Sequence, residues 1–159
     1  MLQPASLFTR IAIGKGIGLI VGLICMASLP LFLADIDTLF RWGVLFWYTT
    51  MGAFIGVFGV FTWHPVLKLP MPWWFRSTLI GAWMNFVLVL LTHTQLDAML
   101  QAPFVQGSIL ASPWWLVPEG GVVGLMIGFF ATLAGGEGKA IVDERPPVEE
   151  PSARFSNKL

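Results

Sequence analysis

Two histidines are the side chains of this sequence best suited to bind haem iron or chlorophyll magnesium. His64 directly follows the apolar stretch 42–63, and His93 lies near the end of the apolar stretch 75–94. In two antiparallel membrane helices these positions lie on opposite sides of the bilayer, about 25 to 30 Å apart. That distance excludes a haem bound by both histidines of one subunit. We therefore predict no metal and no cofactor, and the ligation of a pigment or haem by His64 or His93 alone stays open.

Asn85 is the most conspicuous polar residue inside an apolar stretch, within GAWMNF at 81–86. An amide in hydrocarbon needs a hydrogen-bond partner, and such a bond between two helices is worth about 1 kcal/mol. The prediction is that Asn85 joins helices as polar glue. The alternative hypothesis places Asn85 together with Trp83 on the wall of a ligand or pigment pocket.

A carboxylate inside a membrane helix would indicate a site for proton or cation transport. Glu119 is the nearest candidate, and it stands at the start of the apolar stretch 117–134, where the helix dipole stabilises a negative charge. We interpret it as a helix-terminus residue. The sequence shows neither a nucleophile with a nearby base nor a glycine loop that ends in Lys-Ser/Thr. We therefore expect no catalytic residues and no enzyme.

Hydrophobic residues make up 56% of the 159-residue chain and charged residues only 11%, against about 25% charged residues in a soluble domain. This composition is typical of an integral membrane protein. Nine basic residues balance nine acidic ones, so no electrostatic attraction to nucleic acid is expected. The single cysteine, Cys25, lies in an apolar stretch and is interpreted as a packing residue.

Four stretches are apolar over a length that suits a membrane helix, which needs about 20 residues to cross the hydrocarbon core. The predicted fold class is therefore all-α, a polytopic membrane protein with a four-helix transmembrane bundle over residues 1–136. The four spans run from about Ile11 to Ala34, Trp42 to Trp63, Phe75 to Thr94 and Val117 to Ala134.

Basic residues indicate the orientation, because Lys and Arg are retained on the cytoplasmic side of a membrane. With the N-terminus inside, four crossings leave eight of the nine basic residues inside and only Arg41 outside. Tryptophans gather near the predicted ends of the spans, as is typical of membrane-interface residues. We expect both termini to be cytoplasmic and, from the size of the chain, a bacterial inner membrane.

The segments outside the spans differ in character. The acidic DIDT at 35–38 offers Asp37 or Thr38 as the N-cap of the second helix. The outer segment 96–116 contains prolines and a glycine that argue against a fifth crossing, so we expect a loop on the outer membrane surface or against a partner. Residues 137–159 are rich in charge and proline and should form a flexible cytoplasmic tail.

Glycines four residues apart, in GxxxG spacing, lie on one face of a helix. Because lipid tails are as apolar as leucine, membrane helices gain from close backbone approach, which small residues permit. We predict that these faces are helix contacts, within or between subunits. Their members are Gly14, Gly18 and Gly22 in the first span, Gly52 and Gly56 in the second, and Gly120, Gly124 and Gly128 in the fourth. The likeness of the first and fourth spans is too short to establish a repeat.

These features favour a non-catalytic integral membrane subunit, which is an accessory, scaffold or assembly factor. Its expected partners are the lipid bilayer and either further copies of the chain, as a homo-oligomer, or a larger membrane protein complex. The alternative is a small oligomeric channel or transporter whose path forms between subunits, lined by Asn85, Thr49 and Thr50.

Overall fold

The computed structural model describes residues 6–63, 69–103, 105, 107–136 and 138. These residues form four α-helices, which confirms the all-α fold class. The helices are α1 (Leu7–Phe32), α2 (Thr38–Phe58), α3 (Trp73–Leu100) and α4 (Leu116–Gly135), and two short 3₁₀ helices, η1 (Ile109–Ala111) and η2 (Pro113–Trp115), precede α4. The predicted tail, residues 137–159, lies outside the described residues except for Gly138.

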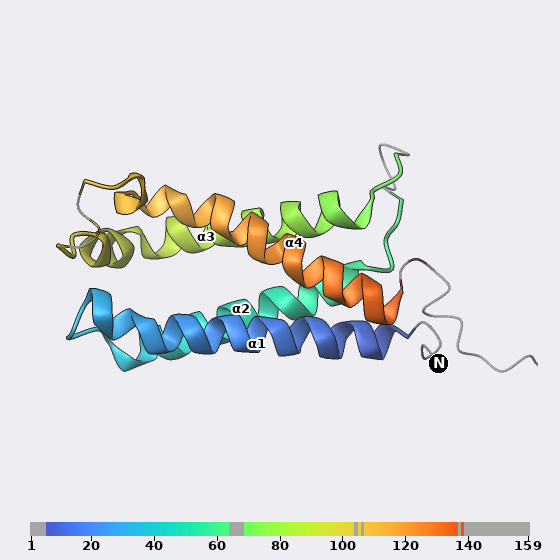
Figure 1. The fold of residues 1–159 in the computed structure, drawn as a ribbon, viewed down its shortest axis with the longest axis horizontal. Coiled ribbons are helices and arrows are strands. Elements are labelled where there is room, and N and C mark those ends of the chain that lie inside the picture. The colour runs from blue at the N-terminus through green and yellow to red at the C-terminus, as the bar shows by residue number, and fades with distance from the viewer. Residues whose placement is uncertain (1–5, 64–68, 104, 106, 137, 139–159) are drawn as a thin grey trace, which may run out of the picture.

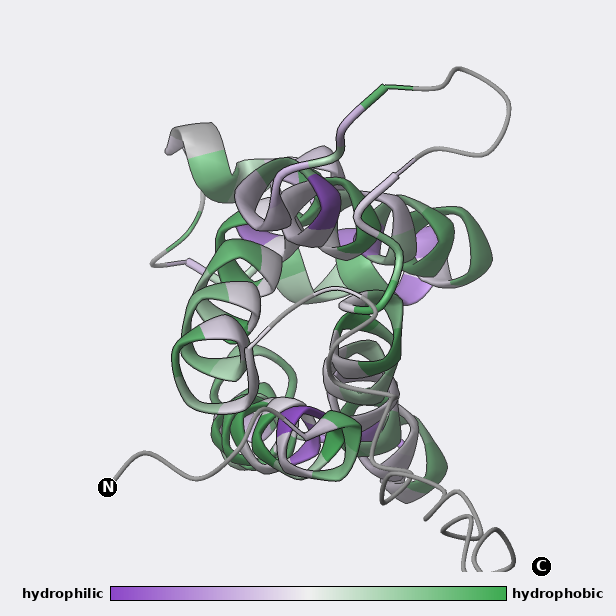
Figure 2. Ribbon diagram, turned by 90° about the vertical axis from the view of Figure 1, so that its right-hand side faces the viewer, coloured by the Kyte–Doolittle hydropathy of each residue, from purple (hydrophilic) through white to green (hydrophobic). Residues whose placement is uncertain are grey.

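Three segments are long and apolar enough to cross a membrane: α1, α3 and the continuous stretch Pro113–Gly135 that includes α4. Helix α2 is not among these three. It has 21 residues but contains an arginine, two tryptophans, a tyrosine and three threonines, which lower its mean hydropathy. Most of the helical ribbon is coloured as hydrophobic in the end-on view (Figure 2), and many large hydrophobic side chains of all four helices are exposed, among them Leu31, Phe46, Leu91 and Leu133. Three helices of this length and composition are typical of a membrane protein.

The helices form two antiparallel pairs (Figure 1). One pair is α1 with α2, and the other is α3 with α4. Helix α4 runs diagonally, so that it lies beside α3 at one end of the molecule and reaches α1 at the other end (Figure 1). Helices α2 and α3 have much less contact with each other than the helices within either pair.

In the first pair, α1 and α2 pack with their backbones in contact, because glycines of both helices face each other. A Cβ added to Gly14 would overlap the carbonyl oxygen of Gly52, and a Cβ added to Gly52 would overlap that of Gly14. Gly18 and Gly22 lie in the same way against the backbone of α2, and Gly56 lies against the backbone of α1. The glycine faces of these two helices therefore meet inside one chain.

The second pair, α3 and α4, uses the same kind of contact. A Cβ on Gly124 would overlap the carbonyl oxygen of Ser77, and a Cβ on Gly128 would overlap the Ser77 hydroxyl. A Cβ on Gly81 would overlap the carbonyl oxygen of Gly120. Ser77 and Gly81 are the small residues that α3 contributes to this contact, and the sequence analysis did not predict their role.

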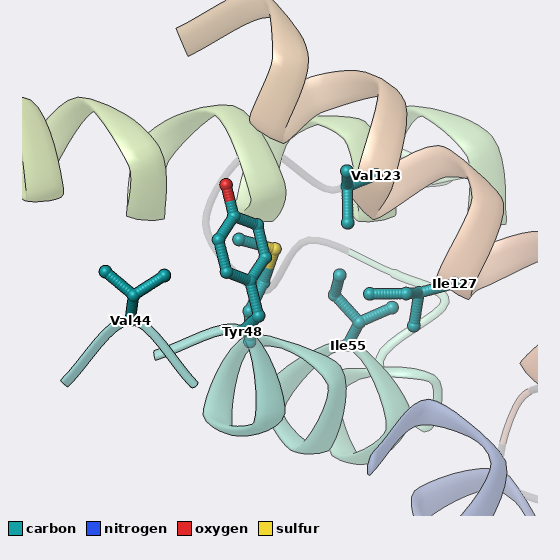
Figure 3. Packing of buried hydrophobic residues seen from close by; sticks show 6 residues of the cluster. Val44, Tyr48, Ile55, Val123 and Ile127 are labelled. Atoms are coloured by element: carbon teal, nitrogen blue, oxygen red, sulfur yellow. The ribbon is translucent and has the colours of Figure 1, made fainter. Parts of the chain in front are cut away.

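Large side chains fill the space between the two pairs. Met51 and Ile55 of α2 meet Ile127 of α4, and all three are at most 1% exposed. Val123 and Ile127 point from α4 towards α2, and the Tyr48 hydroxyl points from α2 towards α3 and α4 (Figure 3). The pairs are therefore joined by side-chain packing, whereas each pair is joined internally by backbone contact.

Arg10, in the first turn of α1, is completely buried and joins α1 to the ends of two other helices. Its Nε donates to the Gly56 carbonyl oxygen at 3.2 Å, and its Nη1 donates to Thr132 Oγ1 at 3.0 Å and to the carbonyl oxygen of Gly136. The glycines whose missing side chains leave room for Arg10 are Gly56, Gly59 and Gly135. The guanidinium thus binds carbonyl oxygens near the C-terminal end of α2 and just beyond the end of α4.

Arg76, in the first turn of α3, has the corresponding role and is 3% exposed. Its Nη1 donates to the carbonyl oxygens of Phe61 at 2.6 Å and Met71 at 3.0 Å. Phe61 lies just beyond the end of α2, as Gly136 lies just beyond the end of α4. Arg10 of α1 therefore binds the chain just beyond α4, and Arg76 of α3 binds the chain just beyond α2. Each of these contacts joins one helix pair to the other.

The helix ends agree only in part with the prediction. The Asp37 side chain accepts a hydrogen bond from the Leu39 amide at 3.1 Å, so the predicted N-cap of α2 is confirmed. Helix α3 bends at Thr92, whose backbone is not helical, and continues to Leu100 beyond the predicted end at Thr94. The prediction was too short because it followed apolar residues, whereas the helix continues through the stretch 93–97, in which Leu96 is the one apolar residue.

The outer segment between α3 and α4 folds back onto the bundle. Met99, Ala102 and Val105 are buried, and turns and the short helices η1 and η2 connect them to α4. Within its described residues this segment makes no further crossing. The sequence predicted a loop on the membrane surface or against a partner, whereas Ala102 and Val105 are buried within the chain itself.

Close backbone contact predicts a sharp difference between two neighbouring glycines of α1. We expect Gly14→Ala to lower the free energy of unfolding by about 1 to 3 kcal/mol, because its Cβ overlaps the α2 backbone. Gly16→Ala is the matched control, since no atom lies within 4 Å of a Cβ at that position. The measurement is unfolding in mixed micelles titrated with SDS and followed by circular dichroism. Equal stability of the two variants would contradict this packing.

The arginine contacts predict a second loss of stability. We expect Arg76→Met to lower the free energy of unfolding by about 1.5 to 3 kcal/mol, because two hydrogen bonds from a buried charged group to backbone carbonyls are lost. Lys15→Gln, at an exposed position of α1, is the control and should change little. The same SDS titration measures both variants, and a stable Arg76→Met protein would show that these bonds do not hold the pairs together.

Candidate functional site

Glu119 lies in the first turn of α4, as predicted, but its side chain reaches into the middle of the bundle. Its Oε2 accepts a hydrogen bond from the Tyr48 hydroxyl at 2.9 Å and another from Asn85 Nδ2 at 2.7 Å. Tyr48 stands in the middle of α2, and Asn85 lies twelve residues after the start of α3. The carboxylate is therefore more than a helix-terminus group, because it joins α4 to α2 and α3.

Asn85 is the centre of this polar cluster and is 0% exposed. Its Nδ2 also donates to the Leu116 carbonyl oxygen at 2.9 Å, and its Oδ1 accepts from Trp47 Nε1 at 3.3 Å. We call Trp47, Tyr48, Asn85 and Glu119 the polar cluster. The amide thus makes contacts from α3 to α2 and to the first turn of α4.

Gly120 allows Asn85 to come this close. A Cβ at Gly120 would lie 2.5 Å from Asn85 Cβ and 2.6 Å from its Cγ. Any side chain at this position would therefore push the amide out of the polar cluster. The glycines of α4 thus allow the close approach of the Asn85 side chain as well as that of the α3 backbone.

A pocket of about 230 Å³ lies beside the polar cluster. Tyr48 and Glu119 form part of its wall, and Cys25 and Ser28 of α1 lie on the wall as well. The rest of the lining is apolar and includes Phe32, Phe40, Val44, Leu88 and Leu96. All four α-helices contribute to this pocket, which therefore lies between the two helix pairs.

Glu119 has no cationic partner among the residues that the structure describes. Both of its hydrogen bonds end on Oε2, and no described residue donates to Oε1. An ionisable side chain within a membrane protein is costly to bury and marks a site by default. Chemically, this carboxylate can hold a proton or pair with a cation that enters the pocket.

The structure does not bring Asn85 and Trp83 to one wall. Trp83 is 63% exposed and lines a different hollow, a groove of about 810 Å³ between α2 and α3. Residues two apart in a helix point about 200° apart, which explains why Asn85 points inward when Trp83 points outward. Of the threonines named for a path between subunits, Thr50 lines this groove, and Thr49 Oγ1 donates to the Leu45 carbonyl of its own helix.

One of the two candidate histidines lies in the part of the chain that the structure describes. His93 is exposed and its ring lies 6.0 Å from that of Trp114. His64 lies outside the described residues. Among the described residues, no three His, Cys, Asp or Glu side chains stand close enough together to hold a metal ion.

Sequence reasoning found Asn85 and Glu119 separately but not their contact, which joins residues 34 positions apart. It missed Tyr48 and Trp47 as their partners. One signal was available, because Tyr48 is the only tyrosine of the chain and stands in a predicted span. A phenol in hydrocarbon needs a hydrogen-bond partner, just as an amide does.

Comparisons with known proteins gave no match to any family model, to any curated protein or to any solved structure.

The polar cluster predicts energetic coupling between Tyr48 and Glu119. In a double-mutant cycle of Tyr48→Phe and Glu119→Gln, we expect a coupling of about 1 kcal/mol, because the phenol donates directly to the carboxylate. Thr49→Val combined with Glu119→Gln is the control and should show no coupling, since the Thr49 hydroxyl bonds within its own helix. SDS unfolding titrations supply the four free energies of each cycle. Additive effects of Tyr48→Phe and Glu119→Gln would rule out a hydrogen bond that depends on the charge of the carboxylate.

Proposed function

We propose that this protein is a non-catalytic integral membrane subunit, an accessory, scaffold or assembly factor that packs against itself or a larger membrane complex. In this proposal all four helices cross the bilayer. The contact of α2 with α1 over four successive glycine positions supports a fourth crossing, because Gly22, Gly18, Gly14 and Gly56 all lie against the opposite helix. A helix paired in this way covers most of the membrane depth that α1 covers.

The proposed orientation places both termini in the cytoplasm of a bacterial cell, with the bundle in the inner membrane. The contact of Arg10 with Gly135 and Gly136 supports an even number of crossings, since the start of α1 and the end of α4 lie together (Figure 1). Arg10, Lys15 and Arg76 lie near the starts of α1 and α3, at this end of the bundle. Their charge supports a cytoplasmic location for that end.

The groove between α2 and α3 is the observation that carries the proposal. It has a volume of about 810 Å³, and its lining is almost entirely large and apolar. The lining includes Phe46, Trp47, Phe54, Phe58, Trp83 and Met84. The glycine faces of the helices are already occupied inside the subunit, so this aromatic groove is the surface left for a membrane helix of another subunit.

A channel between subunits has less support. Asn85 is completely buried and makes its hydrogen bonds inside one subunit. A path between subunits lined by its side chain would therefore require the polar cluster to open.

Site-specific photo-crosslinking in native membranes tests the proposal. We replace Trp83 in the groove, or Ile24 on α1, by the photoreactive residue p-benzoylphenylalanine. Both positions are 63% exposed, so they sample lipid equally. We expect Trp83→p-benzoylphenylalanine to give one discrete protein adduct, because a neighbouring helix fills the groove, and Ile24→p-benzoylphenylalanine to give lipid adducts only.

The mass of the adduct distinguishes the partners. A product of twice the 17.5 kDa of the chain indicates a second copy, and any other fixed mass indicates a different subunit. Only lipid adducts at both positions, or the same protein adducts at both, would refute packing through the groove.

A further inference from the structure

The pocket beside the polar cluster combines a carboxylate with an apolar wall, in a part of the molecule that the proposed subunit contacts do not use. Its volume is about 230 Å³. At about 30 Å³ for each water-sized group, it has room for roughly seven non-hydrogen atoms. A ligand that fits within the pocket is a small organic molecule.

The hydrogen bonds of Glu119 leave one side of the carboxylate available. Tyr48 and Asn85 both donate to Oε2, while Oε1 receives no hydrogen bond from any described residue. Glu119 and the Tyr48 side chain lie on the pocket wall. A hydrogen-bond donor with a positive charge would therefore find a fixed anion and a phenol oxygen at one end of the pocket.

The rest of the wall decides what kind of cation fits. Metal ions such as Ca²⁺ need six to eight oxygen ligands, and the described residues hold no cluster of three metal-binding side chains. Apart from Glu119, Tyr48, Ser28 and Cys25, the pocket is lined by apolar residues, among them Phe32, Phe40 and Leu96. This lining suits a hydrocarbon group and offers little to a hydrated ion.

We infer that the pocket binds a small organic ammonium ion, a protonated amine of about six carbon atoms. The ammonium group pairs with Glu119 Oε1 and lies beside the Tyr48 hydroxyl. The hydrocarbon part of the ligand lies among Phe32, Phe40 and Leu96. The polar cluster holds the carboxylate in place for this ligand, since two donors fix Oε2. Binding requires no covalent step and no cofactor.

Titration of the purified full-length protein with n-hexylamine tests the inference. The readout is the rise of the thermal melting temperature with ligand concentration, which yields a dissociation constant. We expect saturable binding to the wild type and a dissociation constant at least about tenfold higher for Glu119→Gln, because the charge pair is lost. Asp97→Asn, which removes an exposed carboxylate of α3, is the control and should bind like the wild type.

A neutral ligand of the same shape separates the contribution of the charge to binding from that of the hydrocarbon chain. We expect 1-hexanol to bind the wild type at least about tenfold more weakly than n-hexylamine, and to bind Glu119→Gln and the wild type alike. Equal affinity of the wild type for the amine and the alcohol would overturn the ion pair. Equal amine affinity of Glu119→Gln and the wild type would overturn it as well.

A pocket-filling variant covers the case in which Glu119→Gln does not fold. Ser28→Leu places a larger side chain on the pocket wall and leaves every hydrogen bond of the polar cluster intact, because the Ser28 hydroxyl donates only to the Cys25 carbonyl. We expect this variant to lose amine binding. Unchanged amine binding by Ser28→Leu, or no saturable binding by the wild type, would overturn the inference and would leave the groove between α2 and α3 unaffected.

Discussion

Close backbone contact within each helix pair is the constraint on which the rest of the structure depends. In a bilayer, burying leucine against leucine gains little, so helices associate where small residues let their backbones meet. Gly14 and Gly52 do this in the first pair, and Gly81, Gly120 and Gly124 do it in the second. Two tight pairs result, and side chains fill the interior between the pairs except where Gly135 comes close to the Arg10 backbone.

Polar groups join the pairs at two levels. At one end, Arg10 and Arg76 bind carbonyl groups at or beyond the last turn of a helix of the opposite pair. In the middle, Tyr48 of the first pair and Asn85 of the second both donate to Glu119. Since hydrocarbon offers no competing partner, each of these groups must find its bond inside the protein, which restricts how the pairs can dock.

The sequence predicted features that one helix determines by itself, but it did not predict contacts between two helices. The helical class follows from composition, and the N-cap Asp37 from local chemistry. The contact of Asn85 with Glu119 could not be foreseen, because a helix periodicity does not say which helix lies opposite. Buried arginines were also missed, because Arg10 was counted as a charge outside the span, whereas the cavity left by Gly59 and Gly135 lets it remain inside.

Trp47 connects the groove between α2 and α3 to the polar cluster. Its ring lines the groove between α2 and α3, while its indole N–H donates to Asn85 Oδ1 in the polar cluster. An occupant of the groove that moves this ring therefore changes a hydrogen bond of Asn85, which in turn holds the Glu119 carboxylate. If a helix binds the groove and a cation binds the pocket, the two affinities are coupled, and by linkage each ligand changes the affinity of the other by the same factor.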